Sequence, residues 1–398
     1  MRLWLVAIGL VGSAGGAVAR ADTWKAEVEA GGEWDSNVHR VEVDPAGTRV
    51  AVGAPLARAG ARVEGAGRAG AWGRWWIAGA GRVRTVTSDV RGEDVGALAL
   101  DARWDRGLGD RRVRVGARAS WYDATALTEP SSARTFALAA ADGFLVLTGD
   151  GDRRFALSAG GRDFTYRPDA DFDWHGAAVG ARLVATVWRR GAAIAVDAPE
   201  LADDLAALGV GDAAEATVEL AVGWRLERRS YHGVAFDDGC APGDPVVPAC
   251  FVPTGERRSD LHHVGEVEAT YTGDVVVTAG YELTVNDSSS YGQSLVRHRL
   301  SGSATIELPG QVYATGSAAL QVDQYLDPLL LARDVVSQSF TSIDDENRSA
   351  LAVRLSRRVG RGFTAEARWA FFADSLSKDD LEFRRQVVYG GLTWSSDD

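Results

Sequence analysis

Long runs of strict alternation between apolar and polar side chains constrain this chain more than any other feature. Residues 274–286 (DVVVTAGYELTVN), 296–308, 112–121 and 363–371 place apolar residues at every second position. A period of two is the pattern of a β-strand with one apolar and one polar face. These runs exceed the ~5–6 residues of an ordinary soluble strand and match the ~9–11 residues that cross a membrane at a tilt. Many apolar positions are Ala or Gly, which suits a surface covered by lipid tails better than one packed on a second sheet.

The connections between these runs alternate in length. Tight turns rich in Gly, Asp and Pro occur at 149–152, 272–274, 309–310 and 359–362. Longer polar loops lie between them, at 35–52, 124–132, 232–257, 326–345 and 375–382. Short turns on one side and long loops on the other are typical of outer-membrane barrels, with the short side in the periplasm. The sequence therefore predicts an all-β chain that forms a transmembrane antiparallel β-barrel in the outer membrane.

Sixteen segments carry the strand pattern, eight before a break at 189–213 and eight after it. They are 23–34, 54–65, 71–84, 93–104, 111–122, 133–147, 153–166, 172–188, 214–230, 258–271, 274–286, 293–308, 311–324, 346–358, 362–373 and 383–394. An even number of strands places both termini in the periplasm. The break is then a periplasmic insertion. If residues 192–197 (AAIAVD) form part of an extra hairpin, the barrel has eighteen strands instead.

The N-terminus has the layout of a secretory signal peptide. Arg2 precedes a short apolar stretch at 3–11, and Ala19-Arg20-Ala21 matches the A-x-A cleavage pattern. We expect residues 1–21 to be the signal peptide and residues 22–398 to form a single barrel domain. The expected partners are outer-membrane lipid and the machinery that inserts barrels into that membrane.

The cysteines Cys240 and Cys250 both fall in the Pro-rich segment 232–257. In an exported protein two cysteines are expected to pair, so the sequence predicts a disulfide that staples an extracellular loop. Two thiols without a nearby His are a poor metal site, and we predict no metal and no cofactor. The formal net charge of −12 without a basic cluster argues against a nucleic-acid partner.

The segment 31–38 (GGEWDSNV) resembles the first-strand signature of a broad set of outer-membrane barrels. That set includes the barrel part of surface lipoprotein assembly modifiers and other tetratricopeptide-linked barrels. Residues 384–394 (RRQVVYGGLTW) look like the C-terminal assembly strand of such proteins. The resemblance covers most of the chain as architecture but only short stretches as motif. This sequence shows no helical repeat region ahead of the barrel, so lipoprotein handling is not carried over. Trp394 is followed by four more residues, whereas the assembly signal usually ends on the aromatic residue.

The polar faces of the strands carry many charges, which need water because burying them unpaired costs several kcal/mol each. A barrel of this size leaves an aqueous channel. The candidate lumen-lining residues are Arg58, Arg62, Arg74, Arg103, Arg112, Arg114, Arg118, Glu219, Glu266, Glu282, Arg297, Arg299, Glu366 and Arg368. They either solvate the wall as ion pairs or select the solute. Arginines concentrate in residues 58–118 and acids in the second half, which predicts a transverse field if the two halves face each other.

These features favour a translocation channel. It is either a diffusion porin, with the 232–257 loop folded inward as a constriction, or the exit conduit of an export system. An export conduit would suit an extended polymer such as polysaccharide and would meet a periplasmic partner at 189–213. A barrel enzyme and a closed structural or adhesive barrel are the alternatives. The sequence contains no G-x-S-x-G or H-E-x-x-H motif, from which we predict that the chain is not an enzyme.

Overall fold

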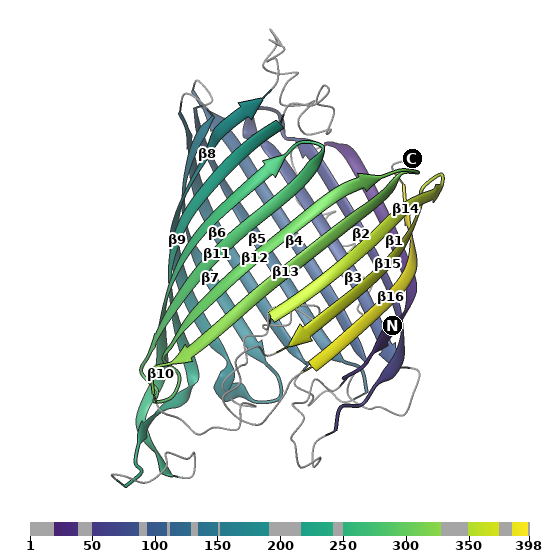
Figure 1. Cartoon of the computed structure of the whole chain (residues 1–398). Coiled ribbons are helices and arrows are strands. Elements are labelled where there is room, and N and C mark those ends of the chain that lie inside the picture. The colour runs from purple at the N-terminus through teal and green to yellow at the C-terminus, as the bar shows by residue number, and fades with distance from the viewer. Residues whose placement is uncertain are drawn as a thin grey trace.

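The alternating segments form strands that join into one closed sheet, as the computed structural model of the chain shows (Figure 1). The structure describes residues 20–38, 50–86, 94–109, 112–128, 134–149, 152–190, 216–241, 250–327, 349–373 and 384–396. The strands are β1 (Arg20–Asp35), β2 (Ala54–Arg68), β3 (Arg74–Val86), β4 (Val95–Leu108), β5 (Val113–Ala126), β6 (Phe136–Thr148), β7 (Arg153–Tyr166), β8 (Trp174–Arg190), β9 (Ala216–Asp238), β10 (Phe251–Thr272), β11 (Val275–Ser288), β12 (Leu295–Leu308), β13 (Val312–Tyr325), β14 (Ser349–Gly360), β15 (Phe363–Ala373) and β16 (Arg384–Ser395). Two 3-10 turns, η1 (Gly70–Trp72) and η2 (Ala170–Phe172), lie in the β2–β3 and β7–β8 connections.

Each strand pairs antiparallel with its neighbours in sequence, and β1 pairs with β16 to close the ring of sixteen. The prediction of an all-β, sixteen-stranded transmembrane barrel is therefore confirmed. β8 pairs directly with β9, so the ring leaves no place for the extra hairpin that eighteen strands would need. β1 begins and β16 ends at the rim that carries the short turns, because Glu27 pairs with Ser395 and Arg20 with Arg68. In the described part of the chain, no helix has the length and apolar character needed to span a membrane.

One predicted boundary needs correction. The insertion cannot begin at 189, because Arg189 and Arg190 are still paired with Thr217 and Ala216 of β9; its remaining residues lie outside the described residues. Residues 1–19 of the expected signal peptide also lie outside them. β1 begins at Arg20, inside the segment 1–21.

The predicted loop 232–257 is shorter in the structure, because β9 continues to Asp238 and β10 starts at Phe251. These two residues are partners in the ladder. The two strands extend beyond the rim as a projecting hairpin (Figure 1). Its tip carries the Cys240–Cys250 disulfide, with a Cα–Cα distance of 5.0 Å. The described ends of this connection thus point away from the barrel and do not fold inward.

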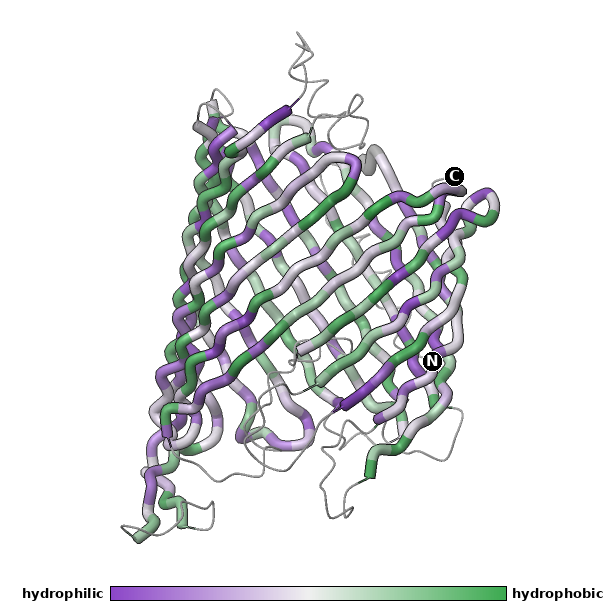
Figure 2. The backbone as a smooth tube through the Cα atoms, in the orientation of Figure 1, coloured by the Kyte–Doolittle hydropathy of each residue, from purple (hydrophilic) through white to green (hydrophobic). Residues whose placement is uncertain are grey.

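The two faces of the sheet differ in the way the alternation predicts, and Figure 2 shows the strands changing between hydrophobic and hydrophilic along their length. One face carries large apolar side chains that remain exposed, such as Leu300 (57%), Trp24 (53%) and Val222 (52%). Their exposure is stable only against lipid, so this is the outer face of the barrel. The other face, here called the inner wall, carries the charged residues.

The motif in residues 31–38 closes the barrel. Asp35 is fully buried, and its carboxylate accepts hydrogen bonds from Nη2 of Arg385 and Nη2 of Arg84, each at 2.6 Å. The Asn37 amide donates to the carbonyl of Arg384 at 3.3 Å. These contacts join the end of β1 to β16 on one side and to β3 on the other. The residues behind the family resemblance are therefore structural residues of the β1–β16 seam.

A ladder of aromatic side chains crosses the inner wall of β5–β9 toward the long-loop rim. Ring centroids of Tyr122, Phe136, Phe164, Trp174 and Tyr231 follow one another at 5.6, 5.9, 5.8 and 6.5 Å. Phe136, Phe164, Trp174 and Tyr231 are almost completely buried. This cluster is the largest apolar core of the described barrel and stiffens one side of its wall.

Candidate functional site

The charged side chains of the inner wall converge across intervening strands. Arg154 of β7 reaches Glu219 of β9 at 2.9 Å, past β8. Arg182 of β8 reaches Glu268 of β10 at 3.2 Å, past β9. Contacts between every second strand form on the concave face of a curved sheet, where side chains approach each other. The inner wall is therefore the lumen side of the barrel.

The strand register places thirteen of the fourteen lumen candidates on the inner wall. Followed from strand to strand, each of the thirteen lies on the same face of the sheet as the ion pairs Arg154–Glu219 and Arg182–Glu268. The exception is Arg112, which lies in the β4–β5 turn because β5 starts at Val113. The closest acidic partners of the candidate arginines are Glu29 for Arg58, Glu64 for Arg62, Asp105 for Arg74, Arg103 and Arg114, Asp142 for Arg118, Asp323 for Arg297 and Glu366 for Arg368. Among the candidate acids, Glu219 meets Arg154 and Glu266 meets Arg182. Glu282 and Arg299 are register partners on β11 and β12.

Many of these paired charges project into open space. The side chains of Arg118, Arg103 and Arg354 are 59%, 52% and 51% exposed. Arg58 and Arg297 differ, because their side chains are only 7% and 16% exposed. A filled or collapsed lumen would bury the first group, since every inner-wall side chain would then have neighbours. The exposed pairs show that the wall faces a space large enough for water.

Two acidic residues that were not among the predicted lumen candidates each pair with two arginines of the inner wall. Asp105 receives Arg74 at 3.2 Å and Arg114 at 3.5 Å. Asp142 receives Arg118 and Arg162, each at 2.9 Å. Asp105 shares the parity of Arg103, so the alternation itself could have identified it. The partners of each acid could not be found that way, because they come from neighbouring strands whose register the pattern does not give.

Charge is unevenly distributed around the ring. On β2–β8 the arginines of the inner wall outnumber the acids: Arg58, Arg62, Arg74, Arg82, Arg84, Arg103, Arg114, Arg118, Arg154, Arg162 and Arg182 stand beside Glu64, Asp101, Asp105 and Asp142. On β9–β13 the acids outnumber the arginines: Glu219, Glu227, Asp260, Glu266, Glu268, Glu282, Glu307 and Asp323 stand beside Arg225, Arg229, Arg258, Arg297 and Arg299. In a ring of sixteen strands, β5 stands opposite β13. The strands β2–β8, with their excess of arginine, are here called the basic arc, and β9–β13, with their excess of acids, the acidic arc; the two arcs face each other where β2–β5 stand opposite β10–β13.

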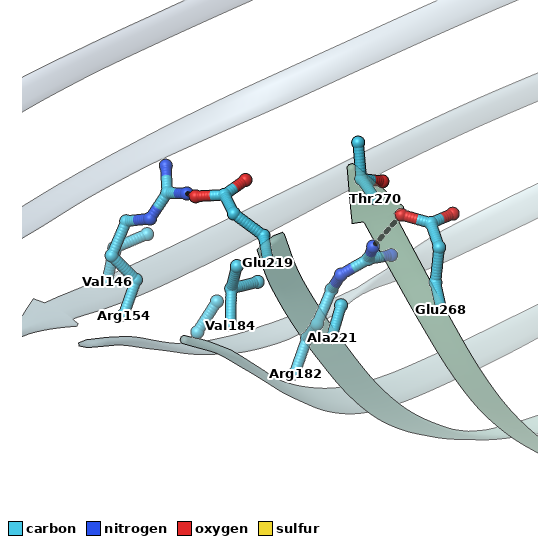
Figure 3. Close-up of a pocket in the computed structure, with 9 residues that line it drawn as sticks. Val146, Arg154, Arg182, Val184, Glu219, Ala221, Glu268 and Thr270 are labelled. Carbon is cyan, nitrogen blue, oxygen red and sulfur yellow. Dashed lines mark hydrogen bonds and ion pairs between the residues drawn. The ribbon is translucent and has the colours of Figure 1, made fainter. Parts of the chain in front are cut away.

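The two arcs meet between β8 and β9, where the wall is hollowed. A cavity of about 310 Å³ near the short-turn rim is lined by Val146, Arg154, Ala156, Arg182, Val184, Glu219, Ala221, Glu268 and Thr270. Figure 3 shows the guanidinium groups of Arg154 and Arg182 turned toward Glu219 and Glu268, with small apolar side chains between them. The charged side chains around this hollow are 40–50% exposed.

Two glycines of the inner wall, Gly223 and Gly160, differ in the room that they leave for a side chain. A Cβ at Gly223 would overlap the carboxylate of Glu266, and a Cβ at Gly160 would overlap the backbone oxygen of Ala141. Glu266 can swing away, whereas a backbone oxygen cannot. We therefore expect Gly223→Ala to change the free energy of unfolding by less than ~1 kcal/mol and Gly160→Ala to lower it by about 1–3 kcal/mol. Urea unfolding in lipid vesicles measures both, and equal losses would contradict this account.

The disulfide removes one further candidate. Asp238, Cys240 and Cys250 bring their ligand atoms within 4.8 Å of one another. Both sulfurs are bonded to each other, so neither is the thiolate that a metal would require.

No known protein family matches the chain, and no curated protein sequence matches it significantly. Its structure is similar to OmpT, an outer membrane protein of Vibrio cholerae, with 11% identity over 94% of this chain and 100% of that one and a TM-score of 0.39. It is similar to OccK2 (OpdF) of Pseudomonas aeruginosa, with 9% identity over 95% and 99% and a TM-score of 0.42. OccAB1 of Acinetobacter baumannii gives 10% identity over 96% and 99% and a TM-score of 0.40.

The prediction that the chain is not an enzyme needs correction. It relied only on the lack of a short catalytic motif in the sequence. Activity depends on the site and not on the fold, so a missing motif does not exclude catalysis. The likeness to these structures concerns the fold alone, and this chain forms a closed antiparallel barrel of sixteen strands.

Proposed function

We propose that this protein is an outer-membrane channel that passes small hydrophilic solutes through a hydrated, charge-lined lumen. One observation carries the proposal: inner-wall charges such as Arg118, Arg103 and Arg354 are more than half exposed although they point into the barrel. A closed structural barrel would pack that space with side chains, because an interior without water penalises charged groups. The facing basic and acidic arcs support the proposal further, since charged walls of opposite sign orient polar solutes during passage.

Conductance in planar bilayers tests the channel, and the basic arc gives it a specific signature. Wild-type protein is expected to give stable current steps. Arg114 and Arg118 lie on β5 in the middle of the basic arc. Their joint replacement, Arg114→Glu with Arg118→Glu, should lower the anion-to-cation permeability ratio about fivefold, because one unit charge at ~4 Å in water is worth about 1 kcal/mol.

The double variant Arg114→Lys with Arg118→Lys is the matched control, since it keeps both charges and should keep the wild-type selectivity. The shift caused by glutamate should shrink at high salt, because the Debye length falls to about 3 Å at 1 M. Absence of current steps from protein whose gel mobility shifts on heating, as that of a folded barrel does, would contradict the channel. Equal selectivity of the glutamate and lysine variants would contradict a role for these residues.

Several finer features are part of the same proposal. An N-terminal signal peptide would export the chain, the barrel-assembly machinery would insert it with both termini in the periplasm, and lipid would cover its apolar outer face. The diffusion channel is favoured over an export conduit because the hollow between β8 and β9 has the size of a small-molecule site, ~300–1,000 Å³. The resemblance to the barrels of surface lipoprotein assembly modifiers stays a prediction from the sequence.

A further inference from the structure

The hollow between the two arcs combines three chemical features in one place. Arg154 and Arg182 come from β7 and β8, and Glu219 and Glu268 come from β9 and β10. The hollow thus holds two ion pairs, Arg154–Glu219 and Arg182–Glu268, so that charges of opposite sign alternate along its wall. Between them, Val146, Val184 and Ala221 form a small apolar floor. Figure 3 shows this alternation of charge around a non-polar centre.

From this geometry we infer that the hollow is a binding subsite for a small zwitterion with an aliphatic side chain, an α-amino acid of the leucine type. The carboxylate of the solute would meet Arg154 or Arg182, its ammonium group would meet Glu219 or Glu268, and its side chain would cover the apolar floor. This inference rests on the proposed channel function, because the solute reaches the hollow through the lumen.

The charge balance favours a zwitterion over a simple anion or cation. Glu219 and Glu268 line the hollow together with Arg154 and Arg182, and Glu266 pairs with Arg182 beside it at 2.7 Å. An anion would therefore meet carboxylates beside every guanidinium, and a cation would meet guanidinium groups beside every carboxylate. A solute with both charges can satisfy both sides. Ionised partners form the stronger class of hydrogen bond.

The resident ion pairs do not prevent this binding. The side chains of Arg154 and Glu219 are 50% and 40% exposed, and those of Arg182 and Glu268 are 41% and 45% exposed. Exposed pairs contribute little to stability because water screens them. A solute can therefore separate or bridge them at little cost, which is what a weak, rapidly exchanging subsite in a channel requires.

Equilibrium dialysis of radiolabelled leucine against the full chain, folded in detergent micelles, tests the inference. Leucine should bind saturably. Two competitors have its skeleton with one charge removed: 4-methylpentanoate lacks the ammonium group and 3-methylbutylamine lacks the carboxylate. Each should compete about tenfold more weakly than unlabelled leucine, because each loses a charged hydrogen-bonding group. Equal competition by either compound would overturn the zwitterion inference.

Variants locate the site. Arg154→Gln combined with Glu219→Gln should weaken leucine binding about tenfold. The matched control is Arg62→Gln combined with Glu64→Gln, which removes an exposed inner-wall pair on β2 and should leave binding unchanged. Unchanged binding in the first variant, or equal loss in both, would overturn the site.

Dialysis does not depend on conductance, so the two proposals can fail separately. Current steps without leucine binding would remove the subsite alone. Leucine binding without current steps would remove the proposed channel and leave the subsite standing as a binding site. Heat-dependent gel mobility of every variant confirms that a folded barrel is being tested.

Discussion

Replacing Asp35 by asparagine should lower the free energy of unfolding by about 3–5 kcal/mol, the usual cost of breaking a buried ion pair by removing one partner. Asp35 is completely buried between Arg84 and Arg385, whose exposed fractions are 7% and 5%. The carboxylate receives the Arg385 guanidinium through both Nε (3.0 Å) and Nη2 (2.6 Å). An asparagine of the same shape would remove the carboxylate that Arg385 meets through two nitrogens and would leave Arg84 paired with Glu33.

The effect should be large because Asp35 holds the seam where the ends of the chain meet. Arg385 belongs to β16 and Arg84 to β3, so one carboxylate connects three strands. Urea unfolding in lipid vesicles gives the free energy, and heat-dependent gel mobility reports the folded fraction. The matched control is Glu64→Gln, which breaks the exposed Arg62–Glu64 pair and should cost less than ~1 kcal/mol. A cost for Asp35→Asn as small as that of the control would mean that the seam does not depend on this network.

The second large effect concerns two neighbouring residues of β12. Leu300→Arg should lower the free energy of unfolding by about 2–4 kcal/mol, the cost of an arginine near the bilayer midplane on a lipid-facing site. Leu300 lies near the middle of β12, is 57% exposed and pairs with Tyr281 and Leu320 on the outer face. A guanidinium there would have to be taken into hydrocarbon or reach toward the interface.

Ser301→Arg introduces the same side chain one residue later and should change the free energy of unfolding by less than ~0.5 kcal/mol, as surface substitutions do. Ser301 belongs to the inner wall, and its partners Gly280 and Ala319 are small, so the new arginine has both room and water. The pair of variants is thus a direct test of which face meets lipid. A larger loss for Ser301→Arg would reverse the assignment of the faces, and equal losses would be incompatible with a hydrated lumen inside a membrane barrel.

The sequence predicted the strands well because the boundary between lipid and water acts on each residue separately. Leu300 and Ser301 are neighbours in one strand, so their side chains point to opposite faces of the sheet. This alternation can be seen in the sequence of a single strand. The same rule placed Arg103, Arg114 and Glu266 on the inner wall. It failed for Arg112, because the start of β5 depends on the geometry of the turn and not on the alternation.

The lengths of β9 and β10 were not predictable in the same way. Four prolines between 242 and 253 indicate a loop, yet Pro253 lies within β10 and pairs with Phe236 across an irregular register. Phe236 donates its N–H to Ser290 Oγ and accepts the N–H of Tyr291, so it needs no N–H group from Pro253. The pairing of the two strands with each other thus decides how far they continue beyond the membrane. Because neither face of this hairpin meets lipid, its sequence shows no alternation that would reveal the strands.

The sequence alone determined the class of fold and the face on which thirteen of the fourteen candidate charges lie, because these follow from a period of two that lipid and water impose locally. The choice of sixteen strands over eighteen needed the pairing of β8 with β9. Only the tertiary structure decided which charges meet. Asp35 and Arg385 are separated by 350 positions, and Arg182 finds Glu268 across β9 only because the sheet curves and closes. The function proposed for the hollow depends on such encounters, since a charge pattern along one strand does not specify its partners on the others.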